Sequence, residues 1–347
     1  MSLVLSVDGG RWRAHLRGVA DATPGLVPVA KGNGYGLGLA SLARRSAWLG
    51  ADTIAVGTYA EVTEVASRFD GSVLVLTPWR PWVGALAPEL AKRVVHTVSR
   101  PEDVDALLEA QPGARVVLER MTSMRRHGMS AAELWSSAPA AARAGARVEG
   151  VTIHLPMDAP PGRNEAEARA LLDDVIGAGA STVWVSHLDA PALERLRTAY
   201  PDLVVRPRLG TSLWLGDRGA LRVTSVVQDV HPIERSERFG YRRGRGVSGH
   251  LLVVSGGTAN GIGLVAPSGD ASPRGRAAVL AKGAIEAAGT LRSPFSLDGR
   301  ALEFAEPPHM QASMLALPRG SRVPEVGETV DVAVRFTTTT FDEIRLS

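Results

Sequence analysis

The chain has 347 residues, of which 45% are hydrophobic and 22% charged, so it can bury a large core and is expected to hold two domains. It contains no cysteine, which excludes disulfides, thiolate metal sites and thiol nucleophiles. The formal net charge is only +3, and the first residues lack the basic segment of a signal peptide. Because no run is long and apolar enough to span a membrane, we expect a cytoplasmic protein with no membrane partner.

The densest basic stretch spans residues 235–245, with Glu234 and Glu237 beside and within it. Such a stretch allows nucleic-acid binding. The interspersed acidic residues favour a solvated loop or an anion-binding edge, and we expect no nucleic-acid partner.

Lysine is rare in this chain, since only three of its 39 basic residues are lysines. One of them, Lys31, ends an apolar run and precedes the glycine-rich segment Gly-Asn-Gly-Tyr35-Gly. An amine with a lowered pKa can form a Schiff base, whereas a guanidinium cannot. Lys31 is therefore a candidate cofactor anchor, and the alternative is a surface lysine before a loop.

Eight β-rich runs alternate with amphipathic segments in the first two-thirds of the chain. Leu39, Leu42, Ala43 and Ala47 recur at helical spacing before Gly50, which predicts one helix. The predicted strands are Leu26–Ala30, Thr53–Val56, Val73–Leu76, Val94–Val98, Arg115–Leu118, Gly150–His154, Thr182–Val185 and Leu203–Arg206. Eight β/α units favour a TIM-type (β/α)8 barrel over residues 1–216, with its active site at the carboxyl ends of the strands.

Two helix starts are predicted within this barrel. Asn164, with Glu167 three residues later, indicates the N-cap of a helix that reaches about Ile176. Asp189 is expected to cap the helix of residues 191–198.

From about residue 217 the pattern changes to strands separated by Gly, Pro and Arg turns. The predicted strands begin at Val223, His250, Met314 and Thr329, and a helix-like insert is predicted over Arg276–Ala288. Residues 217–347 are therefore expected to form a second, mostly β domain.

The segment Val29-Ala-Lys31-Gly-Asn-Gly-Tyr35-Gly-Leu-Gly38 resembles the cofactor-lysine motif of alanine racemases, which are barrel-type pyridoxal 5'-phosphate (PLP) enzymes. A barrel followed by a β domain is also that family's architecture. The resemblance implies that Lys31 holds PLP covalently and is the acid/base on one face of the substrate. It further implies that Tyr35 contacts the cofactor phosphate.

The segment from Leu118 to Gly128 resembles the family segment after the fifth strand. The match places Arg126 on the arginine that contacts the cofactor's phenolic oxygen and the substrate carboxylate, a contact that suits the planar guanidinium. Glu119 falls where many members carry a carbamylated lysine, and we expect it to supply that negative charge directly. The alternative is an ordinary ion pair at the barrel rim.

His154 matches the family's histidine beside the pyridine ring, and Arg208 lies in a segment that resembles the one carrying the family's pyridine-nitrogen arginine. An arginine at that nitrogen leaves it unprotonated, which weakens the ring as an electron sink and disfavours transamination. Backbone N–H groups around Gly210 and Thr211 are expected to hold the phosphate.

Tyr241 falls in the second domain where the resemblance places the catalytic tyrosine for the opposite face. In the family that tyrosine reaches the partner's barrel, which implies a head-to-tail homodimer. Met310 is implied as a substrate contact. The alternative for Tyr241 is a packed hairpin residue.

Several positions depart from the family pattern. The phosphate-binding serine aligns with Asp189, although Ser186 serves if the register shifts. The family's Gly-Tyr-Ala-Asp-Gly turn is Gly257-Thr258-Ala-Asn-Gly261 here, and Gln311 replaces an aspartate. The C-terminal extension with a further active-site tyrosine is absent from this sequence. These changes are expected to alter substrate access while leaving the core chemistry.

We interpret the chain as a PLP-dependent racemase of a small amino acid, with alanine the first expectation, that uses Lys31 and Tyr241 as its two bases. One alternative is a barrel-type PLP decarboxylase of basic amino acids, although Arg208 opposes it because those enzymes pair the pyridine nitrogen with a carboxylate. The others are a non-catalytic PLP-binding protein and an inactive relative kept as an interaction partner.

Overall fold

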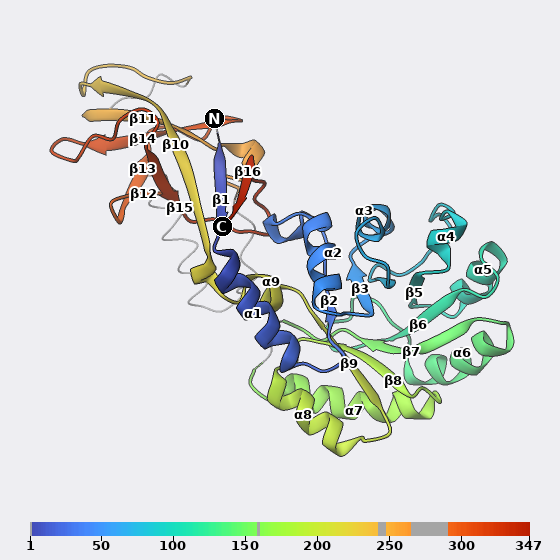
Figure 1. Cartoon of the computed structure of the whole chain (residues 1–347). Helices are drawn as coiled ribbons and strands as arrows, with labels where there is room; N and C mark the ends of the chain where they lie inside the picture. Colours follow the sequence, from blue (N-terminus) through green and yellow to red (C-terminus); the bar gives the residue numbers. More distant parts are fainter. Residues whose placement is uncertain (1, 158–159, 242–247, 265–290) are drawn as a thin grey trace. The chain divides into compact units, whose positions relative to one another are not determined.

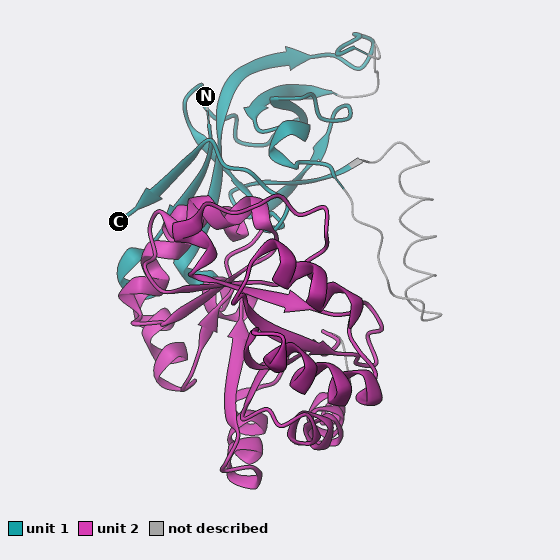
Figure 2. Ribbon diagram, turned by 90° about the vertical axis from the view of Figure 1, so that its right-hand side faces the viewer, with its two compact units in different colours: residues 1–12, 217–347 teal, residues 13–216 magenta. Residues whose placement is uncertain are grey.

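The computed structural model describes residues 2–157, 160–241, 248–264 and 291–347. Figure 2 shows that the chain divides into two compact units, one of residues 13–216 and the other of residues 1–12 and 217–347. The division lies within helix α1 (Gly9–Asp21). The first twelve residues, which we assign to the barrel from the sequence, therefore belong with the second unit.

The larger unit contains a parallel eight-stranded sheet in the order β2-β9-β8-β7-β6-β5-β4-β3. Strand β2 (Val27–Pro28) pairs with β9 on one side, and a bridge between Val29 and Ala55 joins it to β3 on the other. The predicted TIM-type (β/α)8 barrel is confirmed. The remaining strands are β3 (Thr53–Val56), β4 (Ser72–Val75), β5 (Val94–Val98), β6 (Arg115–Arg120), β7 (Arg147–Ile153), β8 (Thr182–Ser186) and β9 (Val204–Leu209).

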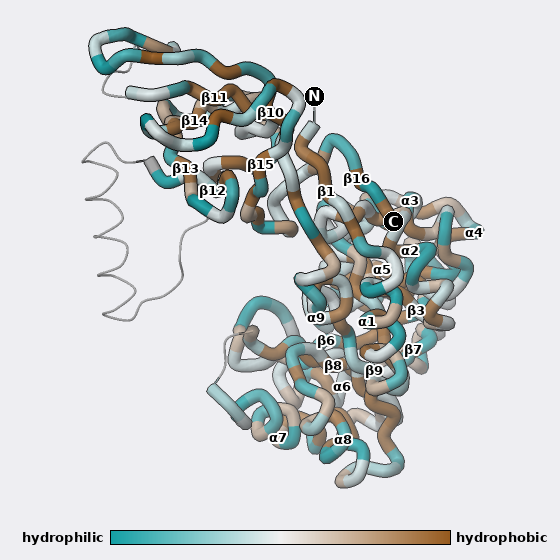
Figure 3. The backbone as a smooth tube through the Cα atoms, turned by 60° about the vertical axis from the view of Figure 1, so that its left-hand side comes forward, coloured by the Kyte–Doolittle hydropathy of each residue, from teal (hydrophilic) through white to brown (hydrophobic). Residues whose placement is uncertain are grey.

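Helices follow the strands and cover the outside of the sheet (Figure 1). Helix α7 buries Ala168, Leu172 and Val175, which lie on one helical face. Figure 3 shows mostly hydrophilic residues along α7 and α8, interrupted at intervals by hydrophobic ones. The helices of this unit after α1 are α2 (Leu39–Trp48), α3 (Val62–Ala66), α4 (Pro88–Ala91), α5 (Glu102–Ala110), α6 (Ala131–Arg143), α7 (Arg163–Gly177), α8 (Ala190–Ala199) and α9 (Thr211–Leu215).

The barrel has an apolar core on each side of its strands. The inward side chains form one buried cluster, which comprises Val27, Val29, Ala55, Leu74, Val95, Val117 and Trp184. A larger cluster lies between the strands and the covering helices and includes Leu118, Leu134, Leu172 and Leu196. Side chains that point into the barrel alternate along each strand with side chains that point toward the helices. Because both groups are buried, the strand sequences are continuously apolar.

Of the two predicted caps, one is confirmed and one is wrong. The Asp189 carboxylate accepts a hydrogen bond from the Ala192 N–H at 2.8 Å and caps α8. Helix α7 begins one residue before Asn164, so Asn164 is not its N-cap. The Asn164 amide instead donates to the carbonyl oxygens of Pro156 and His187 at 2.8 and 3.0 Å.

The second unit is an eight-stranded sheet in the order β11-β14-β13-β12-β15-β10-β1-β16. The long strand β10 (Leu221–Ile233) also pairs with β11, which closes six of these strands into a ring. Strand β1 (Leu3–Val7) pairs with β10 in antiparallel register, with Leu3 opposite Ser225. The other strands are β11 (Gly249–Ser255), β12 (Leu291–Leu297), β13 (Arg300–Phe304), β14 (Ala312–Pro318), β15 (Thr329–Val332) and β16 (Glu343–Leu346).

The predicted mostly β character of this unit is confirmed for its described residues. The helix-like insert predicted over Arg276–Ala288 lies outside them, as does part of the basic stretch at 235–245. In the part of the chain that the structure describes, none of the helices has the length and apolar character needed to cross a bilayer.

Candidate active site

Lys31 lies three residues after β2 and two after the bridging residue Val29, at the carboxyl end of a barrel strand, as the sequence predicts. Burial lowers the pKa of Lys31, and the positive charges of Arg126 and Arg208 lower it further. The negative charge of Glu61 raises this pKa and so offsets part of the shift. An amine under these conditions is more often neutral at a given pH and so more nucleophilic. The structure therefore gives Lys31 the electrostatic environment of a reactive lysine.

The turn after Lys31 is held by a carboxylate that our sequence interpretation missed. Glu61 accepts hydrogen bonds from the N–H groups of Gly32 and Gly57 at 2.7 and 2.6 Å. These two residues follow β2 and β3, so Glu61 links the ends of neighbouring strands. A Thr58-to-Glu61 capping box is the local sequence signal that points to Glu61.

Tyr35 lies in a turn with its ring buried and its backbone in the left-handed region at φ 55°. Burial raises the pKa of Tyr35 to about 12, with a further contribution from Glu61, so the phenol stays protonated and can donate a hydrogen bond. Its Oη approaches Gly210 so closely that a Cβ built on Gly210 would lie 2.0 Å away. Only glycine fits this contact, which brings Tyr35 to the N-terminal end of α9, where Thr211 begins the helix.

Arg208 is a buried arginine on β9 whose Nε–H group has no acceptor. Its Nη2 donates to the Ile153 carbonyl oxygen at 2.9 Å, whereas its Nε has no hydrogen-bond partner. Burial lowers the pKa of Arg208 to about 10, and the Glu119 carboxylate opposes this shift. A buried donor without an acceptor is costly, so Arg208 is suited to an acceptor that a ligand provides.

Glu119 is buried on β6, and its Oε2 also lacks a partner. Burial raises the pKa of Glu119 to about 6, while Arg208, Arg126 and Arg80 lower it. At neutral pH the side chain is therefore mainly ionised. Arg126 is exposed in the loop after β6, and its charge lowers the pKa values of both Lys31 and His154.

His154 directly follows β7, and its Nδ1 lies 3.1 Å from the Ser186 hydroxyl at the end of β8. Burial lowers the pKa of His154 to about 3, and Arg208 and Arg126 are the next causes, so the ring is neutral at physiological pH. His187 packs edge-on against it, with ring centroids 5.3 Å apart. Ser186 thus orients His154, a contact that the sequence alone does not reveal.

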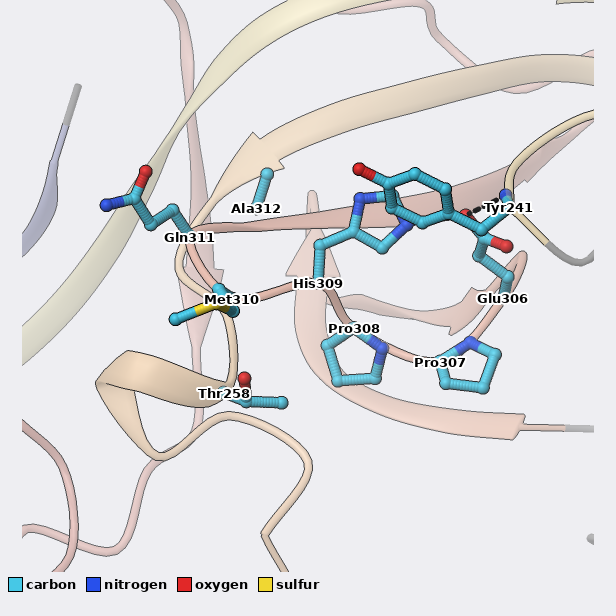
Figure 4. A pocket seen from close by; sticks show the side chains of 9 residues that line it. All are labelled: Tyr241, Thr258, Glu306, Pro307, Pro308, His309, Met310, Gln311 and Ala312. Atoms are coloured by element: carbon cyan, nitrogen blue, oxygen red, sulfur yellow. Dashed lines mark hydrogen bonds and ion pairs between the residues drawn. The ribbon is translucent and has the colours of Figure 1, made fainter.

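Tyr241 and Met310 belong to the second unit, and both line one pocket of about 780 Å³ (Figure 4). Both side chains are exposed, at 84% and 72% respectively. Thr258 and Gln311, which mark departures from the family pattern, line the same pocket. Sequence reasoning missed its other polar members, Glu306 and His309, which Figure 4 shows beside Tyr241.

The barrel thus brings one group of predicted residues together and the second unit another. Lys31, Glu119, Arg126, His154 and Arg208 influence one another's pKa values at the carboxyl end of the barrel. Tyr35, Gly210 and Thr211 meet at the start of α9.

Comparisons with known proteins find similarity to alanine racemases. A sequence model described as alanine racemase, N-terminal domain, matches residues 7–215. The alanine racemase of Mycolicibacterium vanbaalenii is 29% identical over 265 residues, which span 68% of this chain and 66% of that protein. The alanine racemase of Nitratidesulfovibrio vulgaris is 27% identical over 274 residues, or 70% of each chain.

Solved structures share the fold over the whole chain. The crystal structure of alanine racemase from Bartonella henselae with covalently bound pyridoxal phosphate has a TM-score of 0.74 at 15% identity and covers 100% of both chains. That of the E. faecalis enzyme has a TM-score of 0.73 at 20% identity and covers 99% of this chain. Because the sequence match spans more than half of its residues, the chain belongs to the alanine racemase family.

Proposed function

We propose that this protein is a PLP-dependent racemase that interconverts the enantiomers of a small amino acid, with alanine as the first candidate and D-alanine supply as its role. The observation that carries the proposal is Lys31, a strand-end lysine whose pKa is lowered by burial and by Arg126 and Arg208. When bound, PLP supplies an electron-withdrawing ring that acidifies the α-hydrogen of an amino acid.

The barrel residues fit this cofactor. Lys31 would hold it covalently, and the unpartnered Nε of Arg208 would donate to an acceptor such as the pyridine nitrogen. His154, held by Ser186, would lie beside the ring in its neutral form. Since Arg208 keeps its proton, it supports racemisation over reactions that need a stronger electron sink, including the decarboxylase alternative.

The phosphate would bind at the start of α9. The first N–H groups of a helix have no acceptors within the helix, and a helix N-terminus favours an anion. Tyr35 adds a protonated phenol against Gly210. We therefore assign phosphate binding to Gly210, Thr211 and Tyr35. Asp189 is not assigned to the phosphate, because its carboxylate caps α8.

Arg126 would bind the substrate carboxylate, since it is exposed and its charge acts on Lys31. Glu119 would supply the negative charge that supports Arg126 and Arg208. Lys31 Nζ would take or return the α-proton on one face. Tyr241 would act at the opposite face in a head-to-tail homodimer, with Met310 contacting the substrate.

Two variants test this assignment. Lys31→Ala is expected to lose the covalent cofactor, read as the mass added after borohydride reduction, whereas Lys92→Ala retains it as a matched control. Tyr241→Phe is expected to keep the cofactor and to lose racemisation. A Lys31→Ala protein that still carries reducible PLP, or a Tyr241→Phe enzyme as active as the parent, would refute the corresponding role.

A second candidate is a PLP-binding protein of the same fold that does not racemise. The altered pocket residues Thr258 and Gln311 favour it. It predicts bound cofactor with no α-proton exchange on any amino acid.

A further inference from the structure

We propose that Glu306 and His309 form an acid–base pair in the pocket of the second unit, in which His309 Nδ1 exchanges the proton on the substrate face opposite Lys31. This role rests on the proposed racemase function. It adds to Tyr241 a second group that can move a proton in the same pocket.

The pair has the geometry of a carboxylate-oriented imidazole. His309 Nε2 lies 2.6 Å from Glu306 Oε1. With Nε2–H donated to the carboxylate, Nδ1 carries the lone pair, and in the part of the chain that the structure describes it makes no hydrogen bond. A base oriented by a third group through a hydrogen bond is the arrangement that acid–base catalysis uses.

The Glu306 carboxylate holds Tyr241 as well as His309. Its Oε1 accepts the Tyr241 N–H at 3.3 Å, and the Glu306 side chain is buried. Gly240 permits this approach, since a Cβ at Gly240 would lie 2.2 Å from the carboxylate, and its φ is +66°. One buried carboxylate therefore sets the positions of both the phenol-bearing residue and the imidazole.

The Tyr241 and His309 rings face each other in the pocket. Their centroids are 4.5 Å apart with an interplanar angle of 48°, and Figure 4 shows the two rings overlapping above Pro308. Among the described residues that line the pocket, Tyr241, His309 and the buried Glu306 are the titratable ones. The His309 side chain is 27% exposed, so it is accessible from the pocket.

The segment that carries the pair is held rigidly. Pro307 and Pro308 restrict the backbone between Glu306 and His309. The His309 carbonyl oxygen accepts the Thr258 N–H at 2.8 Å, and the His309 N–H donates to Ala312 at 2.9 Å. Such fixed placement is what a catalytic group requires, because a small displacement costs much of its rate contribution.

The chemistry of the imidazole explains why a histidine is useful here. A neutral imidazole has both a nitrogen lone pair that accepts a proton and an N–H group that donates one. Racemisation needs a group that both takes and returns a proton on this face. His309 Nδ1, which carries the lone pair, would take the proton in one direction and return it in the reverse direction.

The test compares His309→Gln with His231→Gln. His231 also lies beside a carboxylate in this unit, with Nε2 3.3 Å from Asp229, but it does not line the pocket. In heavy water, His309→Gln is expected to retain PLP absorbance and lose about 10²-fold or more of its inversion rate. Added imidazole is expected to restore the inversion rate of His309→Gly. A purely structural role of His309 would not allow this rescue.

The results separate the two claims. A parent that racemises while His309→Gln keeps its rate, or a His309→Gly enzyme that imidazole does not restore, overturns the role of His309 alone. A parent that binds PLP but exchanges no α-proton overturns the racemase function and this role with it. Nitrogen-15 NMR of the apo protein adds a readout without activity: His309 is expected to show a protonated Nε2 that Glu306→Gln disturbs, and an Nδ1-protonated ring would overturn the pair.

Discussion

Glu119 and Arg208 are buried charges inside the barrel, and each reduces the pKa shift that burial imposes on the other. Burial raises the pKa of Glu119 and lowers that of Arg208, while the opposite charge counteracts both shifts. Each side chain also has a fully buried atom without a hydrogen bond, namely Oε2 of Glu119 and Nε of Arg208. The site therefore keeps hydrogen-bonding groups that a ligand can use. Leaving them without partners lowers the stability of the protein when no ligand is bound.

Glu119→Gln is expected to stabilise the protein without cofactor at alkaline pH. The carboxyl has a pKa of about 6 in the folded state against 4.5 in the reference state, so the folded state binds its proton more tightly. The free energy of unfolding of the parent therefore falls as pH rises from 4.5 to 6, by about 2 kcal/mol. Urea unfolding at pH 8 should show a gain of up to this size in the variant, and at pH 4 little difference.

An exposed carboxylate, Glu109, provides the control for that comparison. Glu109→Gln is expected to change the free energy of unfolding little at either pH. Glu119→Gln should also lower turnover, because Arg126 and Arg208 lose their counter-charge. A variant less stable than the parent at pH 8 would contradict the assignment of Glu119 as a strained buried charge.

His96 is expected to contribute to unfolding by acid. It lies buried on β5, where its Nδ1 is 2.9 Å from the Tyr59 hydroxyl, and burial lowers its pKa to about 4. The folded state therefore resists protonation, and stability present above pH 6.5 is lost as pH falls toward 4, by up to roughly 3 kcal/mol. His96→Gln should flatten the dependence of the unfolding free energy on pH in this window, whereas the exposed His231→Gln should not; equal slopes in both variants would refute this.

Gly210→Ala is expected to weaken PLP binding by tenfold or more. The Cβ of an alanine at Gly210 would lie 2.0 Å from Tyr35 Oη and would displace the phenol. Pyridoxal without its phosphate should be affected less. Dissociation constants from absorbance titration measure this, and Gly18→Ala, which has nothing within 4 Å of the new Cβ, is the control. An equal loss for both ligands would exclude a phosphate role.

Asp189→Ala is expected to cost about 1 kcal/mol of stability through the lost helix cap, with no change in PLP affinity. Asp189→Asn should retain most of the stability because asparagine also caps helices well. Thermal or urea unfolding and PLP titration together measure both effects. A selective gain in PLP affinity for Asp189→Ala would mean that the carboxylate opposes the phosphate.

The eight barrel strands could be predicted because each is a short apolar run bounded by turn residues, and their ends mark where Lys31, His154 and Arg208 lie. The place of β1 could not, since Leu3–Val7 pairs with β10 more than 200 residues away and local sequence carries no sign of that partner. The Asn164 cap was wrong for a related reason. Its amide is used by two carbonyl groups, one of them distant in sequence, in place of the helix N-terminus.

In the candidate site, too, local sequence predicts which residues are present but not which distant segments they contact. The residue types and strand-end positions of Lys31, Arg126 and Arg208 are visible in the sequence. The approach of Tyr35 to Gly210, the Ser186–His154 contact and the Glu306–His309 pair depend on segments that meet only in the folded chain. These contacts determine how the groups are oriented, which sequence spacing does not encode.

The first measurement we would make is α-proton exchange by NMR. The protein, supplied with PLP, would be incubated in heavy water with both enantiomers of a panel of small amino acids. We expect exchange accompanied by inversion for at least one of them, alanine first. Bound cofactor with no exchange across the panel would contradict the racemase function and favour the non-racemising PLP protein.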